Sequence, residues 1–209
     1  MSARIAILDY GMGNLRSVEK AVEHVGASAT VTADPGAVRD ADGLILPGVG
    51  AFPRAMERIR ERGLDALASE RLDAGVPVLG ICLGLQLLFE TSSELGGATG
   101  LGLLPGPVDR LHAPGLKVPH IGWAAVRWER QSRLIEGIES GTPFYLVHSF
   151  IVRPTDPADV LGVADYGESF ACAAERDNVF AVQFHPEKSS AAGLRLLANF
   201  AGVCAAVPA

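Results

Sequence analysis

Short apolar runs alternate with amphipathic stretches over the first part of the chain. Continuous apolar runs, typical of buried strands, occur at 5–8, 29–32, 44–46 and 76–79. Between them, apolar residues recur every three or four positions, which predicts a helix over 15–25 that ends at Gly26 and another over 56–72 that is broken at Gly63. Continuous apolar strands that alternate with helices predict a parallel sheet covered on both faces.

The pattern changes in the second half of the chain. Residues 96–106 are rich in glycine and are expected to be irregular. Strand-like segments then follow one another at 118–128, 144–147, 160–164, 170–175 and 179–184. Such a succession predicts antiparallel or mixed pairing. A helix over 191–200, with Ser189 or Ser190 as its N-cap, completes the pattern.

The predicted fold is of the α/β class. It consists of a mostly parallel, doubly wound sheet with flanking helices and a smaller mixed or antiparallel strand region in the second half, in a single domain over residues 1–209. Three glycine-bearing loops, at 9–14, 47–50 and 80–84, follow predicted strands. Because sites in parallel sheets lie beyond the carboxyl ends of the strands, we expect these loops to meet at one edge.

Residues 80–84, Gly-Ile-Cys-Leu-Gly, join a predicted strand to a helical pattern over 85–89. A nucleophile on a sharp strand-to-helix turn has this form. The glycines permit the turn, and the amides that open the helix favour a thiolate. Cys82 is therefore the candidate nucleophile, whereas Cys172 and Cys204 are expected to be small buried hydrophobic residues.

A candidate base follows the last predicted strand, in the segment Gln-Phe-His-Pro-Glu at 183–187. His185 would take the proton of Cys82, and Glu187 would orient the imidazole and stabilise its charged form. The three residues form a Cys-His-Glu triad in chain order. Gln86, one helical turn beyond the cysteine, either holds the polar end of a substrate or is a solvent-exposed helix residue.

The loop Pro-Gly-Val-Gly at 47–50 is a candidate oxyanion hole. Amides of Val49 or Gly50, with the amide of Leu83, would hold the oxyanion, although an ordinary strand-to-helix turn has the same composition. Glycine on both sides lets the Val49 peptide rotate. If the reaction is regulated, we expect the orientation of this peptide to switch it on and off.

Composition narrows the class of protein. Apolar residues make up 48% of the 209 residues, so the chain is expected to fold, and none of its apolar runs approaches the length of a membrane span. A net charge of −6 argues against nucleic acid as a main partner. Three cysteines without framework spacing, and a strand that starts almost at the first residue, predict a cytoplasmic protein. No cofactor or metal is expected, because cysteine and histidine lack zinc spacing.

The motifs at 80–84, 47–50 and 183–189 together resemble the class I glutamine amidotransferases over nearly the whole chain. The stretches at 9–15 and 117–123, with Tyr-Leu-Val-His-Ser-Phe at 145–150, are similar to one branch of them, the glutaminase subunits of imidazole glycerol phosphate synthase. The chain departs from that pattern at Leu85, where methionine is expected, and at Ala124, where asparagine is expected. The second departure puts a polar contact with the partner in question.

The resemblance implies a function and a partner. The glutaminase of that family hydrolyses glutamine through a γ-glutamyl thioester and docks on a (βα)8-barrel cyclase, which uses the ammonia to make imidazole glycerol phosphate in histidine biosynthesis. By similarity, the residues at or near the subunit interface are Asn14, Trp123, Tyr145 and Lys188. Trp123 is equally compatible with a place in the core. His120 and His148 are expected to be structural.

Three other functions fit the same motifs. The chain would be the glutaminase subunit of another synthase, such as that for anthranilate or aminodeoxychorismate, or a cysteine amidohydrolase that needs no partner. The third is a regulatory subunit that binds without catalysis. Only the glutaminase subunit of imidazole glycerol phosphate synthase is expected to need a cyclase partner for glutamine hydrolysis, so that dependence distinguishes it from these three alternatives.

Overall fold

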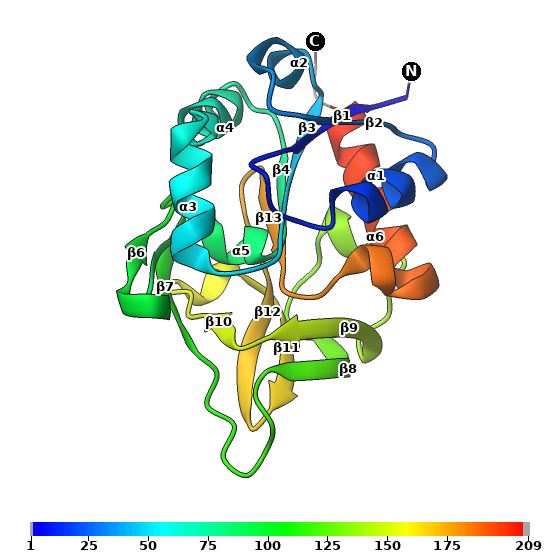
Figure 1. Ribbon diagram of the computed structural model, residues 1–209. Coiled ribbons are helices and arrows are strands. Elements are labelled where there is room, and N and C mark those ends of the chain that lie inside the picture. The colour runs from blue at the N-terminus through cyan, green and yellow to red at the C-terminus, as the bar shows by residue number, and fades with distance from the viewer. Residues whose placement is uncertain (1, 207–209) are drawn as a thin grey trace.

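The computed structural model describes residues 2–206. A twisted sheet runs through the molecule with the strand order β2-β1-β3-β4-β13-β12-β10-β7-β5-β6 (Figure 1). Its first five strands are mutually parallel. They are β2 (Ser28–Thr32), β1 (Arg4–Leu8), β3 (Gly43–Gly48), β4 (Val78–Cys82) and β13 (Val179–Val182).

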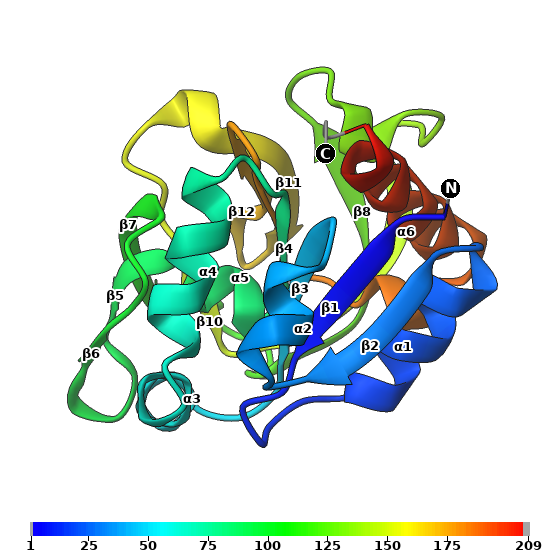
Figure 2. The same ribbon diagram turned by 90° about the horizontal axis from the view of Figure 1, so that it is seen from above.

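Helices cover both faces of these parallel strands (Figure 2). α1 and α6 lie on one face, and α2, α3, α4 and α5 lie on the other. The helices are α1 (Leu15–His24), α2 (Pro35–Arg39), α3 (Phe52–Glu61), α4 (Leu64–Asp73), α5 (Leu83–Leu87) and α6 (Ser190–Ala205). None of the helices within residues 2–206 has the length and apolar character needed to cross a membrane.

Two hydrophobic layers result from the period-two geometry of the strands. Ile5 and Ile7 of β1 belong to the layer under α1 and α6, whereas Ala6 and Leu8 belong to the layer under α3 and α4. All four side chains are almost fully buried. The continuous apolar runs of the sequence thus mark strands with helices on both sides, and the predicted α/β class with its mostly parallel sheet is confirmed.

The second half of the chain adds strands that are mostly antiparallel. β12 pairs with β13, β10 and β11, and β8 pairs with β9 and β11. The strands are β5 (Phe89–Ser92), β6 (Ala98–Thr99), β7 (Leu104–Arg110), β8 (His120–Trp128), β9 (Thr142–His148), β10 (Phe150–Val152), β11 (Val160–Tyr166) and β12 (Glu168–Arg176). Short 3-10 turns lie at Glu94–Gly96, Arg133–Ile135, Pro157–Asp159 and Pro186–Lys188.

The predicted helix 56–72 is two helices, α3 and α4, that meet at Gly63. The φ of +65° at this glycine interrupts the helix as expected. The first helix starts earlier than predicted, at Phe52. Pro53 lies in its first turn, where a missing N–H costs no hydrogen bond, and the carboxylate of Glu94 accepts from the Phe52 N–H at 2.7 Å. A side chain 42 residues away therefore supplies the N-terminal cap.

The prediction was wrong for the segment after Cys82. Residues 85–89 were expected to be helical and 96–106 irregular, but α5 ends at Leu87, and β6 and the start of β7 lie inside the glycine-rich segment. The N–H groups of Leu101 and Leu103 donate to the carbonyls of Leu87 and Leu88, at 2.8 and 2.9 Å. Those carbonyls would otherwise accept within a longer helix, so tertiary pairing ends α5 after little more than one turn.

Candidate active site

Cys82 lies on the predicted sharp turn between β4 and α5. Its φ of 56° and ψ of −109° are a strained combination for a residue with a side chain, and only 7% of its surface is exposed. The flanking glycines have a packing reason. A Cβ on Gly84 would overlap the carbonyl oxygen of Leu46, and one on Gly80 would lie 2.7 Å from the carbonyl oxygen of Gly84. Both glycines therefore allow α5 to pack directly on the sheet.

The sheet brings His185 to Cys82. β13 lies beside β4, with Val182 opposite Ile81, so the residues after both strands emerge at the same edge. The His185 N–H donates to the Tyr145 carbonyl at 2.9 Å, which fixes the histidine backbone against β9. His185 and Cys82 line the same cavity, and the interaction with Cys82 raises the pKa of the imidazole.

Glu187 orients the imidazole from the other side. Its Oε1 lies 2.9 Å from His185 Nδ1, and the two side chains are 1% and 4% exposed. Burial alone would lower the pKa of His185, but the hydrogen bonds and charges of Cys82 and Glu187 together outweigh burial and raise the pKa to about 9. The imidazole is therefore charged at neutral pH and can give up a proton.

A cavity of about 280 Å³ opens over the cysteine. Four residues that were predicted to bind substrate or oxyanion line it: Val49, Gly50, Leu83 and Gln86. Lining residues that were not predicted are Glu94, Pro119, Val147, Ser149 and Phe150. Glu94 is the one carboxylate among these residues. Only its position in the folded chain reveals it, since it lies between β5 and β6 and belongs to none of the motifs.

Gln86 is buried, with 6% of its surface exposed, so the alternative of a solvent-exposed helix residue is wrong. Its Nε2 donates to the carbonyl of Phe150 at 3.1 Å and to Oε1 of Gln183 at 3.0 Å. The amide nitrogen is thus committed to the protein, and the amide oxygen is the end that is left to receive a ligand.

The predicted caps of the last helix need correction. α6 starts at Ser190, and Ser189 stands at the N-cap position without capping it. Instead, the buried Ser189 hydroxyl donates to the His185 carbonyl at 2.7 Å and accepts from the Tyr145 N–H at 3.0 Å. This serine ties His185 to β9, a role that only the folded chain reveals.

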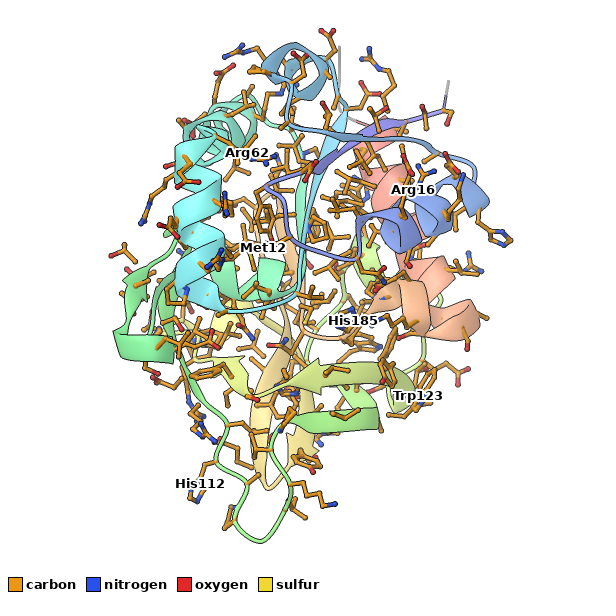
Figure 3. All side chains as sticks on the ribbon, viewed as in Figure 1. Met12, Arg16, Arg62, His112, Trp123 and His185 are labelled. Carbon is orange, nitrogen blue, oxygen red and sulfur yellow. The ribbon has the colours of Figure 1, made fainter. Side chains whose placement is uncertain are left out.

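The predicted interface residues lie in three places: Lys188 lines the cavity, Asn14 contacts Glu187, and Trp123 and Tyr145 pair on strands β8 and β9. Trp123 lies on the surface (Figure 3) and is 51% exposed, so the alternative of a core tryptophan is wrong. Its ring packs edge-on against that of Tyr145, with 5.9 Å between the ring centroids, on the paired strands β8 and β9. Lys188 is exposed and lines the cavity. Asn14 is half-buried, and its Nδ2 donates to Glu187 Oε1 at 3.5 Å, so it contacts the carboxylate that binds His185.

The other histidines and cysteines of the region are satisfied or buried. His120 Nδ1 lies 3.1 Å from His148 Nε2, and His148 Nδ1 lies 3.1 Å from the Phe150 carbonyl oxygen. Burial lowers the pKa of His120, and it lowers that of His148 to about 4. Cys172 and Cys204 are fully buried, as expected. Among residues 2–206, no three His, Cys, Asp or Glu side chains are grouped as metal ligands.

Comparison with known proteins identifies the class to which this fold and site belong. The family model "Glutamine amidotransferase class-I" matches residues 6–203, and the chain belongs to that family. Within it, the chain groups with the HisH subunits of imidazole glycerol phosphate synthase. It is 55% identical over 196 residues to "Imidazole glycerol phosphate synthase subunit HisH" of Moorella thermoacetica, covering 94% of this chain and 93% of that protein.

A second relative agrees with this grouping, and a solved structure agrees with the fold. The same subunit of Bacillus cereus (strain G9842) is 51% identical over 199 residues, covering 95% of this chain and 94% of the relative. Among solved structures, PurLQS from Thermotoga maritima has a TM-score of 0.76 at 21% identity, covering 97% of this chain and 99% of that chain. At that identity the structural match supports the fold alone.

Proposed function

We propose that the chain hydrolyses glutamine to glutamate and ammonia and delivers the ammonia to a (βα)8-barrel cyclase subunit that makes imidazole glycerol phosphate in histidine biosynthesis. The observation that carries this proposal is the buried His185–Glu187 pair, which holds a proton beside a cysteine on a strained turn. The similarity to HisH subunits supports the choice of synthase over those for anthranilate or aminodeoxychorismate.

The first half of the reaction forms a thioester. The Cys82 thiolate attacks the side-chain carboxamide carbon of glutamine, and the oxyanion is held by the amide of Leu83 with an amide of Val49 or Gly50. His185 then gives its proton to the departing nitrogen. Ammonia leaves, and a γ-glutamyl thioester is left on the sulfur.

The second half releases glutamate. Neutral His185 takes a proton from a water molecule, whose oxygen attacks the thioester carbon. The same oxyanion donors hold the second tetrahedral intermediate. The carbon–sulfur bond breaks, glutamate leaves, and the thiolate is again beside a charged imidazole. Glu187 keeps the imidazole oriented throughout.

The cavity offers complementary groups to the amino-acid end of glutamine. Glu94 supplies the negative charge that an α-ammonium group requires, and the Oε1 atom of Gln86 is available as a further acceptor. Glu94 also caps α3 through Phe52, directly after the loop that carries Val49 and Gly50. Substrate binding and the oxyanion loop are therefore connected through one carboxylate.

We further propose that the partner gates the reaction through Val49. This side chain is 42% exposed, and Gly50 beside it has a φ of +110°. Gly48 lets the loop pass close to Tyr10, because a Cβ there would overlap the tyrosine hydroxyl. The interface with the cyclase would include Asn14, Trp123, Tyr145 and Lys188.

Residues 1–209 would act as one domain. The protein would be cytoplasmic, because the cytoplasm keeps free cysteines reduced.

The test is glutamate production from glutamine by the purified chain, first alone and then with a cyclase barrel and its ribonucleotide ligand. We expect little hydrolysis by the chain alone and strong stimulation by the liganded cyclase. Equal activity in both conditions would support a partner-independent amidohydrolase. No activity in either would point to another synthase or to a subunit that only binds.

A further inference from the structure

Gln183 is a buried side chain beside the nucleophile. It follows β13 directly, and none of its surface is exposed. Its Nε2 lies 3.7 Å from Cys82 Sγ, and its Oε1 lies 3.0 Å from Gln86 Nε2. The triad does not use this amide, although it contacts the reacting sulfur.

The carbonyl of Phe150 determines which end of the Gln183 amide faces the sulfur. A carbonyl oxygen can only accept, so the group of Gln86 that lies 3.1 Å from it must be the NH₂ group. The same NH₂ group contacts Gln183, which must therefore present its oxygen. The NH₂ group of Gln183 is left at the opposite end, facing Cys82.

The Phe150 carbonyl has a second hydrogen-bond donor, which belongs to the His120–His148 pair. His148 Nδ1, 3.1 Å from the Phe150 oxygen, must carry a proton to donate there. In neutral His148 the Nε2 atom is then an acceptor, which fits the proton that His120 Nδ1 offers at 3.1 Å. Burial keeps His148 neutral, with a pKa of about 4. Phe150 therefore accepts from two buried donors, His148 and Gln86. From Gln86 onwards, the hydrogen bonds run through Gln183 towards the sulfur.

We propose that Gln183 is a further catalytic residue, whose side-chain N–H donates to the Cys82 sulfur and stabilises the thiolate. This deepens the proposed function and rests on it for the thioester cycle. The sulfur also lies 3.7 Å from the carbonyl oxygen of Val147, which can accept a hydrogen bond only from a sulfur that carries a hydrogen. The Gln183 N–H instead donates to the sulfur, and a hydrogen bond to a charged acceptor is roughly twice as strong as one to a neutral acceptor.

The N–H acts at two points of the cycle. Sulfur is negatively charged before it attacks glutamine and again when the thioester carbon–sulfur bond breaks, and it is neutral in between. A fixed donor on sulfur therefore raises the fraction of reactive thiolate and helps sulfur leave in the second half. His185 alone moves protons, so Gln183 adds no step.

The experiment measures alkylation of Cys82 by iodoacetamide as a function of pH in the full chain, with the modified residue assigned by mass spectrometry. Only the thiolate reacts, so the midpoint of the rate curve reports its formation. In Gln183→Met we expect the midpoint to rise by about one pH unit, with alkylation about tenfold slower below both midpoints and equal rates above them. Gln131→Met, at an exposed glutamine outside the cavity, is the matched control.

An unchanged midpoint in Gln183→Met would overturn the proposal, because a packing role alone changes the rate equally at every pH. Gln183→Glu keeps the shape and the bond from Gln86 but presents an oxygen to the sulfur, so its midpoint must rise further. Should a Gln183 variant not fold, Gln86→Met leaves Gln183 in place, releases its oxygen, and must shift the midpoint in the same direction by less.

Alkylation requires neither glutamine nor a partner. A shifted midpoint in a chain that never hydrolyses glutamine would therefore reject the proposed function and retain the hydrogen bond. An unshifted midpoint in a chain that does hydrolyse glutamine would retain the function and reject Gln183.

Discussion

Two buried histidines in the walls of the same cavity are held in opposite charge states. His185 is 3% exposed and His148 is 5% exposed, so desolvation penalises the charged form of both. His185 faces Cys82 and the carboxylate of Glu187, and its pKa rises to about 9. His148 faces His120 and the carbonyl of Phe150, and its pKa falls to about 4.

The comparison shows that the partners of a buried histidine, more than its burial, decide whether it can serve as an acid. At the edge of the parallel strands, His185 has an anionic partner, the carboxylate of Glu187, which keeps the proton on the imidazole. The antiparallel strands β8 and β10 supply neutral partners, His120 and the Phe150 carbonyl, and His148 becomes a fixed part of the wall. Each prediction below removes one side of this contrast or makes it measurable.

The largest effect is expected from Cys82→Ala, which removes the nucleophile and one of the two partners that hold the proton on His185. Glutamine hydrolysis should fall by about 10³-fold or more, whereas cyclisation by the cyclase partner fed with ammonia should persist. Glutamate release and cyclase product are measured in parallel. Cys204→Ala removes a buried thiol outside the cavity and is the control. Residual hydrolysis near the unmodified level would mean that another group is the nucleophile.

Glu187→Gln makes His185 resemble His148, because a neutral amide replaces the carboxylate. The turnover number should drop by about 10²–10³-fold, since the imidazole loses both its orientation and the stabilisation of its charged form. The pKa of His185, followed by NMR titration, should fall towards that of an ordinary histidine. A pKa that stays near 9 would show that Cys82 alone is sufficient.

The two histidines should impose opposite pH dependences on stability. The folded-state pKa of His185 is raised, so its contribution is complete below about pH 6.5 and is lost as the pH rises through about 9. The pKa of His148 is lowered, so stability is lost as the pH falls from about 6.5 towards 4 and the unfolded chain takes up the proton.

Urea unfolding from pH 4 to 9 measures the free energy of unfolding over both ranges, the acid limb set by His148 and the alkaline limb set by His185. Each should amount to a change on the order of 1–3 kcal/mol, and Glu187→Gln should flatten the alkaline limb only. An alkaline limb that is unchanged in that variant would contradict the assignment of the raised pKa to Glu187.

The smallest effect on the chain itself is expected from Trp123→Ala, on the paired strands that carry the neutral histidine pair. The side chain is half exposed, so the free energy of unfolding should change by no more than about 1 kcal/mol. Affinity for the cyclase should fall by about tenfold or more, measured by titration calorimetry. Leu95→Ala, at an 81% exposed residue away from β8 and β9, is the matched control.

The sequence predicted the parallel half of the fold more closely than the antiparallel half. β1, β3 and β4 lie where continuous apolar runs predicted them, because strands covered on both faces need such runs whatever their neighbours are. The short strands β5 and β10 were not predicted. Their hydrogen bonds depend on partners from distant parts of the chain, which no local pattern specifies.

The site divides in the same way. Cys82, His185 and Glu187 each lie in a local motif at the end of a strand, so the sequence could indicate them, and the structure places all three together. The contact between Gln183 and sulfur and the position of Glu94 depend on how strands and loops pack. These residues could be found only in the folded chain.

The insertion of β13 beside β4 has a consequence for the newborn protein. The ribosome delivers the strands β1 to β4 and the cysteine early, whereas Gln183 follows Cys82 by 101 residues and the histidine comes later still. Until β13 enters the middle of the sheet, His185 is not held beside the thiol. Non-local pairing of this kind is slow to form. On the proposed mechanism, the nascent chain therefore cannot hydrolyse glutamine during translation, and hydrolysis begins only when the sheet is complete.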